Sequence, residues 1–261
     1  VDVATAERLF TDANSRKLLL LQNLRNKQSG AWLRALPDRS RFLAMRNSEF
    51  KVALALRLGL RMAADCKCPV DWCKEMSDGF GDHALICANA RDRVHRHDAV
   101  VHALHRLMCD ADIDCSVEPR ANYLKGQKPA DILAQWPPDS GSRNLCLDVG
   151  VSHRHMLPRR KPWRQYFNDK MALFTKRRTE AGGGGAHFEL EPIIVATTGE
   201  WHEKSFGLIN AFADMAAAVK NQVPAKWRRF ALTSLSVALQ RNNSKAIMAH
   251  IRRFTRCNWP V

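Results

Sequence analysis

Residues 117–170 read VEPRANYLKGQKPADILAQWPPDSGSRNLCLDVGVSHRHMLPRRKPWRQYFNDK, and this stretch decides the fold. Apolar side chains alternate with others over residues 144–151, which predicts a strand that carries Asp148 on its less apolar face. Asp131 alternates in the same way against its neighbours, and the Pro-Pro-Asp-Ser-Gly segment between the two runs is typical of a turn. We therefore expect a hairpin that brings both carboxylates together, where such a pair can hold Mg²⁺.

A predicted helix brings a cation toward these carboxylates. Residues 162–178 have a helical pattern with Pro162 in the first turn. One stripe of that helix consists of Trp163, Tyr166, Phe167, Lys170, Met171 and Phe174. A lysine on an apolar face needs an anionic partner, and a carboxylate–metal site would supply it. The alternative is that Asp131 and Asp148 are ordinary turn or edge carboxylates and that Lys170 extends past the stripe to solvent.

The charge of the chain predicts a polyanionic partner. Its 41 Lys and Arg residues against 26 Asp and Glu give a net charge of +15 and a pI of about 9.9. This balance favours nucleic acid, whereas the alternatives are a solvated basic surface or a basic binding tail. The charge is spread along the chain, which suits a groove along a nucleic-acid backbone. Basic runs occur at Arg159-Arg160-Lys161, Lys176-Arg177-Arg178 and Arg252-Arg253.

Cysteine spacing predicts a small zinc knuckle. Three of the eight cysteines fall within residues 66–73, and His83-x3-Cys87 follows with the spacing of one helical turn. The predicted ligands are Cys66, Cys68, His83 and Cys87, and the pattern leaves open whether Cys73 replaces Cys66 or Cys68. The alternative is a group of free thiols in a reducing compartment.

The remaining segments predict helices around the sheet. Residues 92–108 form an amphipathic pattern that carries Arg96-His97-Asp98 near the point where the helix meets the sheet. Glu118, at the start of a short strand, is a third candidate carboxylate. Further helices are expected over residues 15–26, 48–60, 201–220, 225–239 and 244–254, with another strand over 187–198. No apolar stretch reaches the length of a membrane span, so no membrane partner is expected.

The order of these motifs resembles one known family. The motifs are Cys66-x-Cys68, Gly81-Asp82-His83-Ala84-Leu85-x-Cys87, Arg96-His97-Asp98, Glu118-Pro119, Lys128-Pro129-Ala130-Asp131 and Leu147-Asp148-Val149, followed by a lysine. Over residues 31–200 the chain resembles the C-terminal zinc-knuckle and restriction-endonuclease-like region of site-specific non-LTR retrotransposon polyproteins. The ordered set carries the resemblance, since no single motif is decisive.

The resemblance implies an α/β fold with a PD-(D/E)xK-type core, in which a mixed sheet is flanked by helices. A helical lead-in would cover residues 1–62, the zinc knuckle 63–90, the endonuclease-like core 91–200 and the C-terminal helices 201–261. The catalytic carboxylates map to Asp131 and Asp148, and Glu118 matches an early acidic position. Gly150 occupies the position where the family pattern D-x-K has its lysine, so the catalytic lysine would be Lys170, displaced onto the following helix.

The implied reaction is metal-dependent cleavage of a DNA phosphodiester, with Mg²⁺ or Mn²⁺ held by Asp131 and Asp148. The nick would leave a 3′ hydroxyl that primes reverse transcription in the nucleus. Predicted nucleic-acid contacts are Arg96, His97, Arg159, Arg160, Lys161, Lys176 and Arg177, to DNA and also to the RNA of the element. The chain begins with Val and has no aromatic-x-Asp-Asp polymerase signature, so we expect it to be the tail of a larger polyprotein.

Two other functions stay open at the level of sequence. Gly150 at the expected lysine position is compatible with a decayed nuclease that serves as a zinc-knuckle nucleic-acid-binding module. The charge is also compatible with an interaction scaffold that the basic side chains keep soluble.

Overall fold

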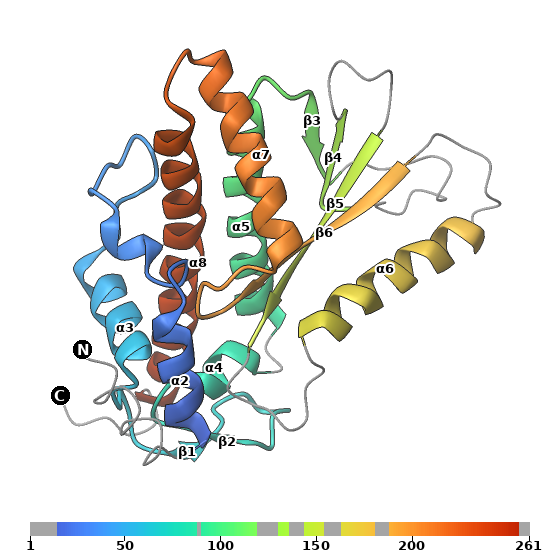
Figure 1. Ribbon diagram of the computed structural model, residues 1–261. Helices are drawn as coiled ribbons and strands as arrows, with labels where there is room; N and C mark the ends of the chain where they lie inside the picture. Colours follow the sequence, from blue (N-terminus) through green and yellow to red (C-terminus); the bar gives the residue numbers. More distant parts are fainter. Residues whose placement is uncertain are drawn as a thin grey trace.

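The computed structural model describes residues 15–87, 90–118, 130–135, 144–153, 163–180 and 188–255, and it has a mixed α/β fold (Figure 1). Its main sheet has the strand order β3 (Cys115–Val117), β4 (Ile132–Gln135), β5 (Asn144–Ser152) and β6 (Phe188–Ala196). The pairs β3–β4 and β4–β5 are antiparallel, and β5–β6 is parallel. The mixed sheet flanked by helices agrees with the expected fold class.

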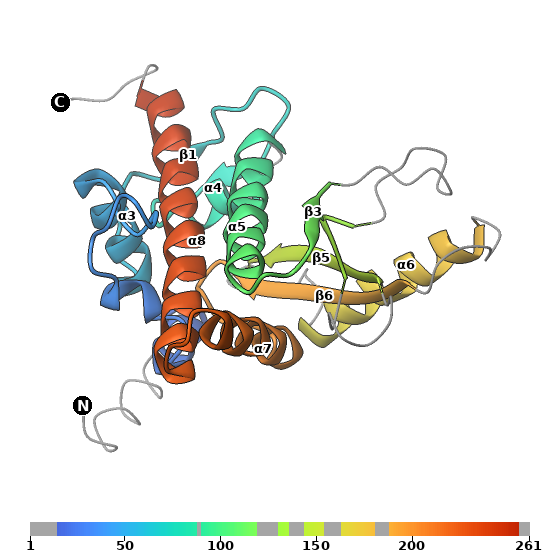
Figure 2. The same ribbon diagram turned by 90° about the horizontal axis from the view of Figure 1, so that it is seen from above.

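Alternation along β5 and β6 divides the sheet into two covered faces. Leu145, Leu147 and Val149 point into the main core, which α5 (Ala90–Asp110), α7 (Glu203–Val219) and α8 (Pro224–Thr255) complete. On the other face, Cys146 and Leu190 form a smaller cluster with Met171 of α6 (Trp163–Glu180). α5 and α6 therefore lie on opposite sides of the sheet (Figure 2).

α8 is one continuous helix of 32 residues, and the sequence prediction of two helices over 225–239 and 244–254 is wrong. The polar residues between those ranges do not end the helix, because their side chains form hydrogen bonds with distant parts of the chain. Gln240 and Asn243 both donate to the carbonyl oxygen of Thr197, and Ser244 donates to that of Glu49. α8 thereby runs unbroken between the N-terminal helices and the helices that cover the sheet (Figure 1).

The N-terminal elements are α2 (Ser15–Arg25), the 3₁₀ turn η1 (Ala31–Arg34) and α3 (Asn47–Leu58), which ends at Gly59 in the left-handed conformation with φ 66°. Of these, η1 and α3 pack along α8 and α2 packs against α3, and the chain then leads into the knuckle. The knuckle consists of the hairpin β1 (Cys66–Lys67) and β2 (Met76–Ser77), followed by α4 (Asp82–Ile86). Among the described residues, no helix is both long and apolar enough to cross a membrane.

Candidate active site and metal centre

Asp131 and Asp148 meet where β4 begins beside β5. Ile132 pairs with Leu147 in the antiparallel ladder, so Asp131, one residue before β4, lies opposite Asp148. The Asp131 N–H donates to the Leu147 carbonyl at 3.0 Å, which fixes this register. The hairpin predicted from the sequence does bring the two carboxylates together.

Leu147 is the last residue of β5 that pairs with β4, so the backbone N–H and C=O of Val149 on that edge have no partner in β4. Its N–H donates to Asp131 Oδ2 at 2.7 Å, and its carbonyl accepts from Lys170 Nζ at 3.1 Å. The side chains of Asp131 and Lys170 thus form the hydrogen bonds to Val149 that a neighbouring strand would otherwise form. This satisfies the Val149 peptide and fixes both side chains against a rigid strand.

Lys170 approaches from α6, as the apolar stripe predicts. Its Nζ donates to Asp148 Oδ2 at 2.6 Å, and the lysine side chain is only 17% exposed. Phe167 beside it is buried, and Met171 packs on the same sheet face. The side chains of Trp163 and Phe174, the other aromatic members of the stripe, lie outside the described residues.

Gly150 makes room for this approach. A Cβ atom on Gly150 would lie 2.7 Å from Tyr166 Cε1 and 2.9 Å from Lys170 Cε. The missing side chain at the D-x-K position is therefore the space through which the stem of Lys170 passes. The absence of a side chain at Gly150 and the approach of Lys170 from α6 are two parts of one arrangement.

His97 lies between two carboxylates. Its Nε2 is 3.0 Å from Asp131 Oδ2 and its Nδ1 is 3.1 Å from Asp98 Oδ1. Burial alone would lower the pKa of His97, but Asp131 and Asp98 together raise it to about 9. An imidazolium donates from both ring nitrogens, so His97 can orient the Asp131 carboxylate. The sequence predicted a nucleic-acid contact for His97, and the structure places its ring against the carboxylates of Asp131 and Asp98.

The pKa values of the two carboxyl groups are shifted in opposite directions. Burial would raise the pKa of Asp131, but His97, the Val149 N–H and Lys170 outweigh it and lower the pKa. Burial raises the pKa of Asp148, and the neighbouring Asp131 adds to this against the opposing effect of Lys170. Oxygen ligands of this kind suit a hard divalent cation, whose charge would favour the ionised form of both groups.

Other predicted site residues lie elsewhere. Glu118 has an exposed side chain, and it reaches the site through its N–H, which donates to the Asp131 carbonyl at 2.8 Å. Arg96 is a correction: it is only 4% exposed and donates to the Leu85 carbonyl at 3.1 Å, so it joins α4 to α5 and does not face a DNA phosphate. Lys176 is exposed on α6. Arg159, Arg160, Lys161 and the side chain of Arg177 lie outside the described residues.

Three cysteines and one histidine converge in the knuckle. Ligand atoms of Cys68, Cys73, His83 and Cys87 all lie within 4.8 Å of one another. Cys68 Sγ is 3.5 Å from Cys87 Sγ, and Cys73 Sγ is 3.7 Å from His83 Nε2. Ligands of tetrahedral zinc with bonds of about 2.0–2.3 Å are separated by roughly 3.5–3.8 Å, so this set fits zinc. A bound zinc would crosslink the hairpin to α4.

Cys73 takes the place predicted for Cys66. β1 pairs Cys66 with Ser77, whose side chain is its hydrogen-bond partner. The chain after β1 turns back on itself, with the Cys73 N–H donating to the Val70 carbonyl at 2.8 Å, and so returns Cys73 toward Cys68. The close C-x-C spacing was misleading because the first cysteine belongs to the hairpin.

The surroundings of Cys68 oppose the ionisation of its thiol. Burial and the neighbouring thiols of Cys87 and Cys73 raise the pKa of Cys68 to about 12, against the effect of the Val70 N–H. Thiolates bind metals and thiols do not, so a bound cation would offset this cost.

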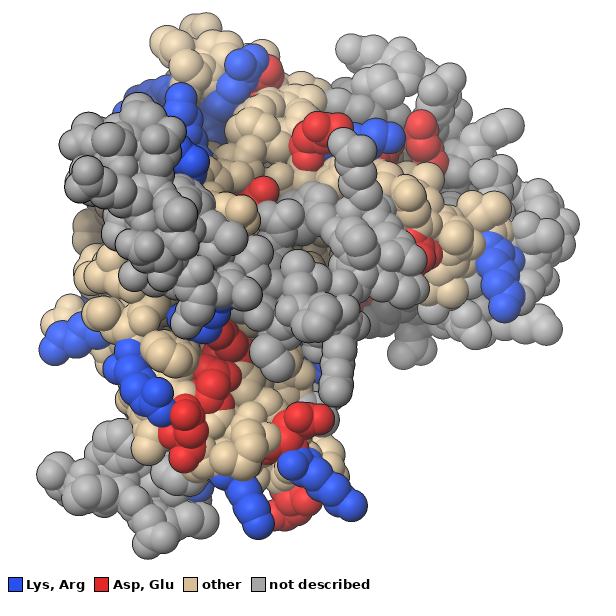
Figure 3. All heavy atoms as spheres, turned by 60° about the horizontal axis from the view of Figure 1, so that its bottom comes forward, with Lys and Arg blue, Asp and Glu red and all other residues tan. Residues whose placement is uncertain are grey.

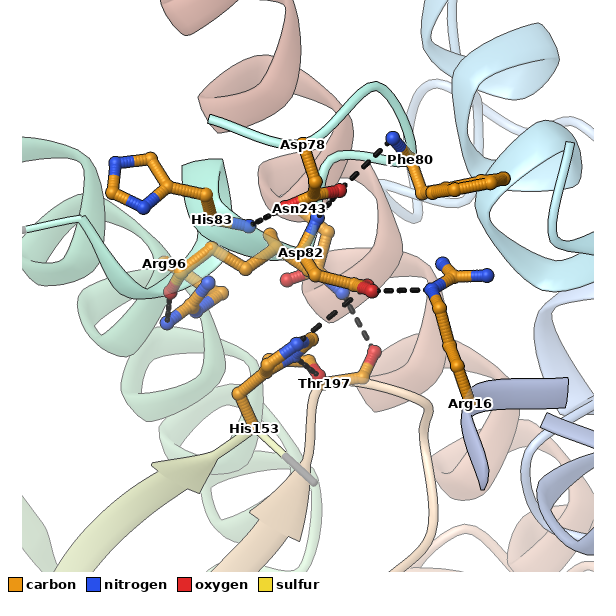
Figure 4. A network of polar contacts seen from close by, with 10 residues as sticks. Arg16, Asp78, Phe80, Asp82, His83, Arg96, His153, Thr197 and Asn243 are labelled. Atoms are coloured by element: carbon orange, nitrogen blue, oxygen red, sulfur yellow. Dashed lines mark hydrogen bonds and ion pairs between the residues drawn. The ribbon is translucent and has the colours of Figure 1, made fainter. Parts of the chain in front are cut away.

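Polar contacts tie the knuckle to the sheet (Figure 4). Asp82, beside the ligand His83, accepts from Arg16 Nε at 2.6 Å. Its other oxygen lies 3.6 Å from Nε2 of His153 at the end of β5. His153 in turn contacts Thr197 through Nδ1 and Oγ1, 2.7 Å apart. The sequence predicted a ligand-bearing segment here and missed this buried network, since its members are far apart in the chain.

The chain matches no model of a known protein family and no curated protein sequence.

Proposed function

We propose that this chain is a metal-dependent DNA endonuclease with a restriction-endonuclease-like core, of the kind found in non-LTR retrotransposon polyproteins. The observation that carries the proposal is the convergence of Asp131, Asp148 and Lys170: Asp131 and Lys170 both bind the Val149 backbone, and Lys170 also donates to Asp148. Two carboxylates and a lysine at one strand end form the set that this nuclease class uses. The resemblance in motif order supports the same assignment.

The residues divide the work. Asp131 and Asp148 would hold Mg²⁺ or Mn²⁺, which lowers the pKa of bound water and offsets charge on the scissile phosphate when bound. His97 and the Val149 N–H orient Asp131. Lys170 is within reach of the same site and would stabilise the negative charge that develops on the phosphate.

The proposed biological setting comes from the resemblance to the retrotransposon polyproteins. The substrate would be DNA in the nucleus, and the 3′ hydroxyl at the nick would prime reverse transcription by another part of a larger polyprotein, with the element's RNA as template. Zinc in the knuckle would be structural, because all four of its positions are taken by protein ligands.

A plasmid-nicking assay tests the proposal. With Mg²⁺ or Mn²⁺ the native chain should convert supercoiled plasmid to the open-circular form, and Asp131→Asn or Asp148→Asn should abolish this while duplex affinity stays within about twofold. Lys170→Ala should lower the rate by about 10²–10³-fold. Asp112→Asn is the matched control, since Asp112 is exposed and has φ 56°, which asparagine tolerates.

One result would leave the binding module as the function. If the native chain binds duplex DNA but nicks it with neither cation, the carboxylates are not catalytic. If Lys170→Ala nicks at the native rate, the role assigned to that lysine is wrong.

A further inference from the structure

A concave surface lies between residues 40–42, α5 and the first half of α8. It holds a cavity of about 230 Å³, lined by aromatic and charged side chains. The aromatic members are Phe42, Trp227 and Phe230, and the charged members are Arg41, Arg106 and Asp110. None of these belongs to the nuclease site or to the knuckle. The cavity is smaller than the roughly 300–1,000 Å³ of drug-sized pockets, so it suits one flat ring system.

Phe42 has an unusual conformation at the edge of this cavity. Its φ is 59°, and its side chain is 50% exposed. A bulky residue is rare in the left-handed region, where glycine would be free of strain. The turn is closed by the Leu43 N–H, which donates to the Asp38 carbonyl at 2.8 Å. Neither the turn nor the core needs an exposed phenyl ring here, and residues held in this way gather at binding sites.

Guanidinium groups lie over the aromatic rings of the cavity. Arg106 Cζ is 4.5 Å from the centre of the Phe42 ring, and Arg41 Cζ is 5.3 Å from that of Phe230. Trp227 meets Phe230 edge to face, with ring centres 5.4 Å apart. Aromatic rings and guanidinium planes are the surfaces on which unpaired bases stack.

A basic cavity adjoins the aromatic one. It measures about 700 Å³ and is lined by Arg39, Arg46, Arg241 and Lys245, together with Glu49, whose carboxylate accepts from the Arg46 N–H at 2.9 Å. Arg241 donates to the carbonyls of Phe42 and Ala44, so it joins the two cavities. Asp110 lies in the aromatic cavity and would repel a phosphate there, whereas the basic cavity would attract one.

We propose that the two cavities form one binding site for a single-stranded polynucleotide. An unpaired base stacks in the aromatic cavity against Phe42 and Arg106, and the phosphates beside it lie on Arg39, Arg46, Arg241 and Lys245. Duplex DNA cannot use the aromatic cavity, because its bases are stacked on each other. The site is therefore distinct from the nuclease site and binds DNA or RNA through chemistry that both share.

The variant Phe42→Gly separates binding from folding. Its affinity for a labelled single-stranded 12-mer, measured by fluorescence anisotropy without Mg²⁺, should fall about tenfold. Its affinity for the duplex of the same sequence should not change. Its thermal midpoint should stay the same or rise, because glycine relieves the positive φ. Phe42→Tyr, the matched control, should bind as the native chain does.

Single-stranded DNA and RNA of one sequence are compared to identify the strand. If Phe42→Gly loses affinity for the single-stranded DNA or RNA but not for the duplex, the result supports the site, and the strand that shows the loss is its ligand. Unchanged affinity for both, or an equal loss for the duplex, overturns the proposal. Arg106→Lys keeps the charge and removes the planar group, so it should weaken single-strand binding severalfold, and native affinity in this variant also counts against the site. Nicking is not part of the readout, so a failure of the nuclease assignment would leave this result unaffected.

Discussion

Gly150 tests the candidate nuclease site at the scale of one residue. Alanine at this position would place a Cβ within 3 Å of Ile194, Tyr166 and Lys170. We expect Gly150→Ala to lower the free energy of unfolding by about 1–3 kcal/mol through overpacking and to move Lys170 away from Asp148. The nicking rate should then fall to that of Lys170→Ala. The plasmid-nicking assay measures the rate, and urea unfolding measures the stability.

Gly207→Ala is the control for this substitution. A Cβ on Gly207 meets nothing within 4 Å, so alanine in α7 should be neutral or stabilise the fold by up to about 1 kcal/mol. Native nicking by a folded Gly150→Ala chain would show that Lys170 does not need the space beside Gly150.

The residues of this site differ in how far the sequence could predict them. Asp131 and Asp148 follow from strand alternation, and Lys170 follows from a helical stripe, because local periodicity fixes the direction of each side chain. The contacts of His97 and Val149 depend on where β4 begins and on how α5 crosses the sheet. Those are tertiary facts, and no local pattern expresses them. Arg96 shows the same limit, since a basic residue in a charged run is buried.

At the scale of elements, the knuckle gives a prediction about its ligands. Cys73→Ser should reduce zinc to well below one ion per chain, because Cys73 lies in the ligand cluster. Cys66→Ser should keep about one ion, since Cys66 belongs to the β1–β2 pair. Elemental analysis of protein purified without chelator measures both. Retained zinc in Cys73→Ser together with loss in Cys66→Ser would restore the ligand set expected from spacing.

The elements also show why boundaries were harder to predict than types. Helices and strands over most ranges follow from hydrophobic period, and α3 and α7 lie close to their predicted limits. The Gln-Arg-Asn-Asn-Ser run predicted a break in the helix. α8 continues through it because the carbonyl oxygens of Thr197 and Glu49 accept hydrogen bonds from its side chains. A polar run ends a helix only where no distant partner satisfies it.

At the scale of the whole molecule, the net charge of +15 predicts strongly salt-dependent duplex binding. Acidic and basic side chains are interspersed on the face seen in Figure 3, so the net charge alone does not locate the DNA-binding surface. If about six phosphates are contacted, affinity should fall roughly 10³-fold between 50 and 200 mM salt, through counterion release. Asp131→Asn should show the same slope, since it leaves every basic side chain in place. A plot of log affinity against log salt with near-zero slope would exclude a DNA-binding role.

Metal removal tests whether the knuckle and the sheet fold as one unit. The sequence divides them at about residue 90, but Asp82 joins Arg16 of α2 to His153 at the end of β5, and Ser77 Oγ lies 3.0 Å from Nε2 of His250 in α8. Loss of the metal should unfold the knuckle and expose these buried partners. If their coupling stabilises the core by about 2–3 kcal/mol, chelation should lower the thermal midpoint of the whole chain by about 4–12 °C.

Calorimetry with a zinc-selective chelator, together with near-ultraviolet circular dichroism, measures this coupling. Asp82→Asn is the matched variant, because it weakens the link to Arg16 and His153 while the four ligands remain. Chelation should therefore lower the midpoint of Asp82→Asn by less than that of the native chain, since part of the coupling is already lost. Equal shifts would show that the metal stabilises the core by another route. An unchanged midpoint in the native chain, with the knuckle unfolded, would show that the two parts fold independently and that the contacts through Asp82 add nothing to the stability of the sheet.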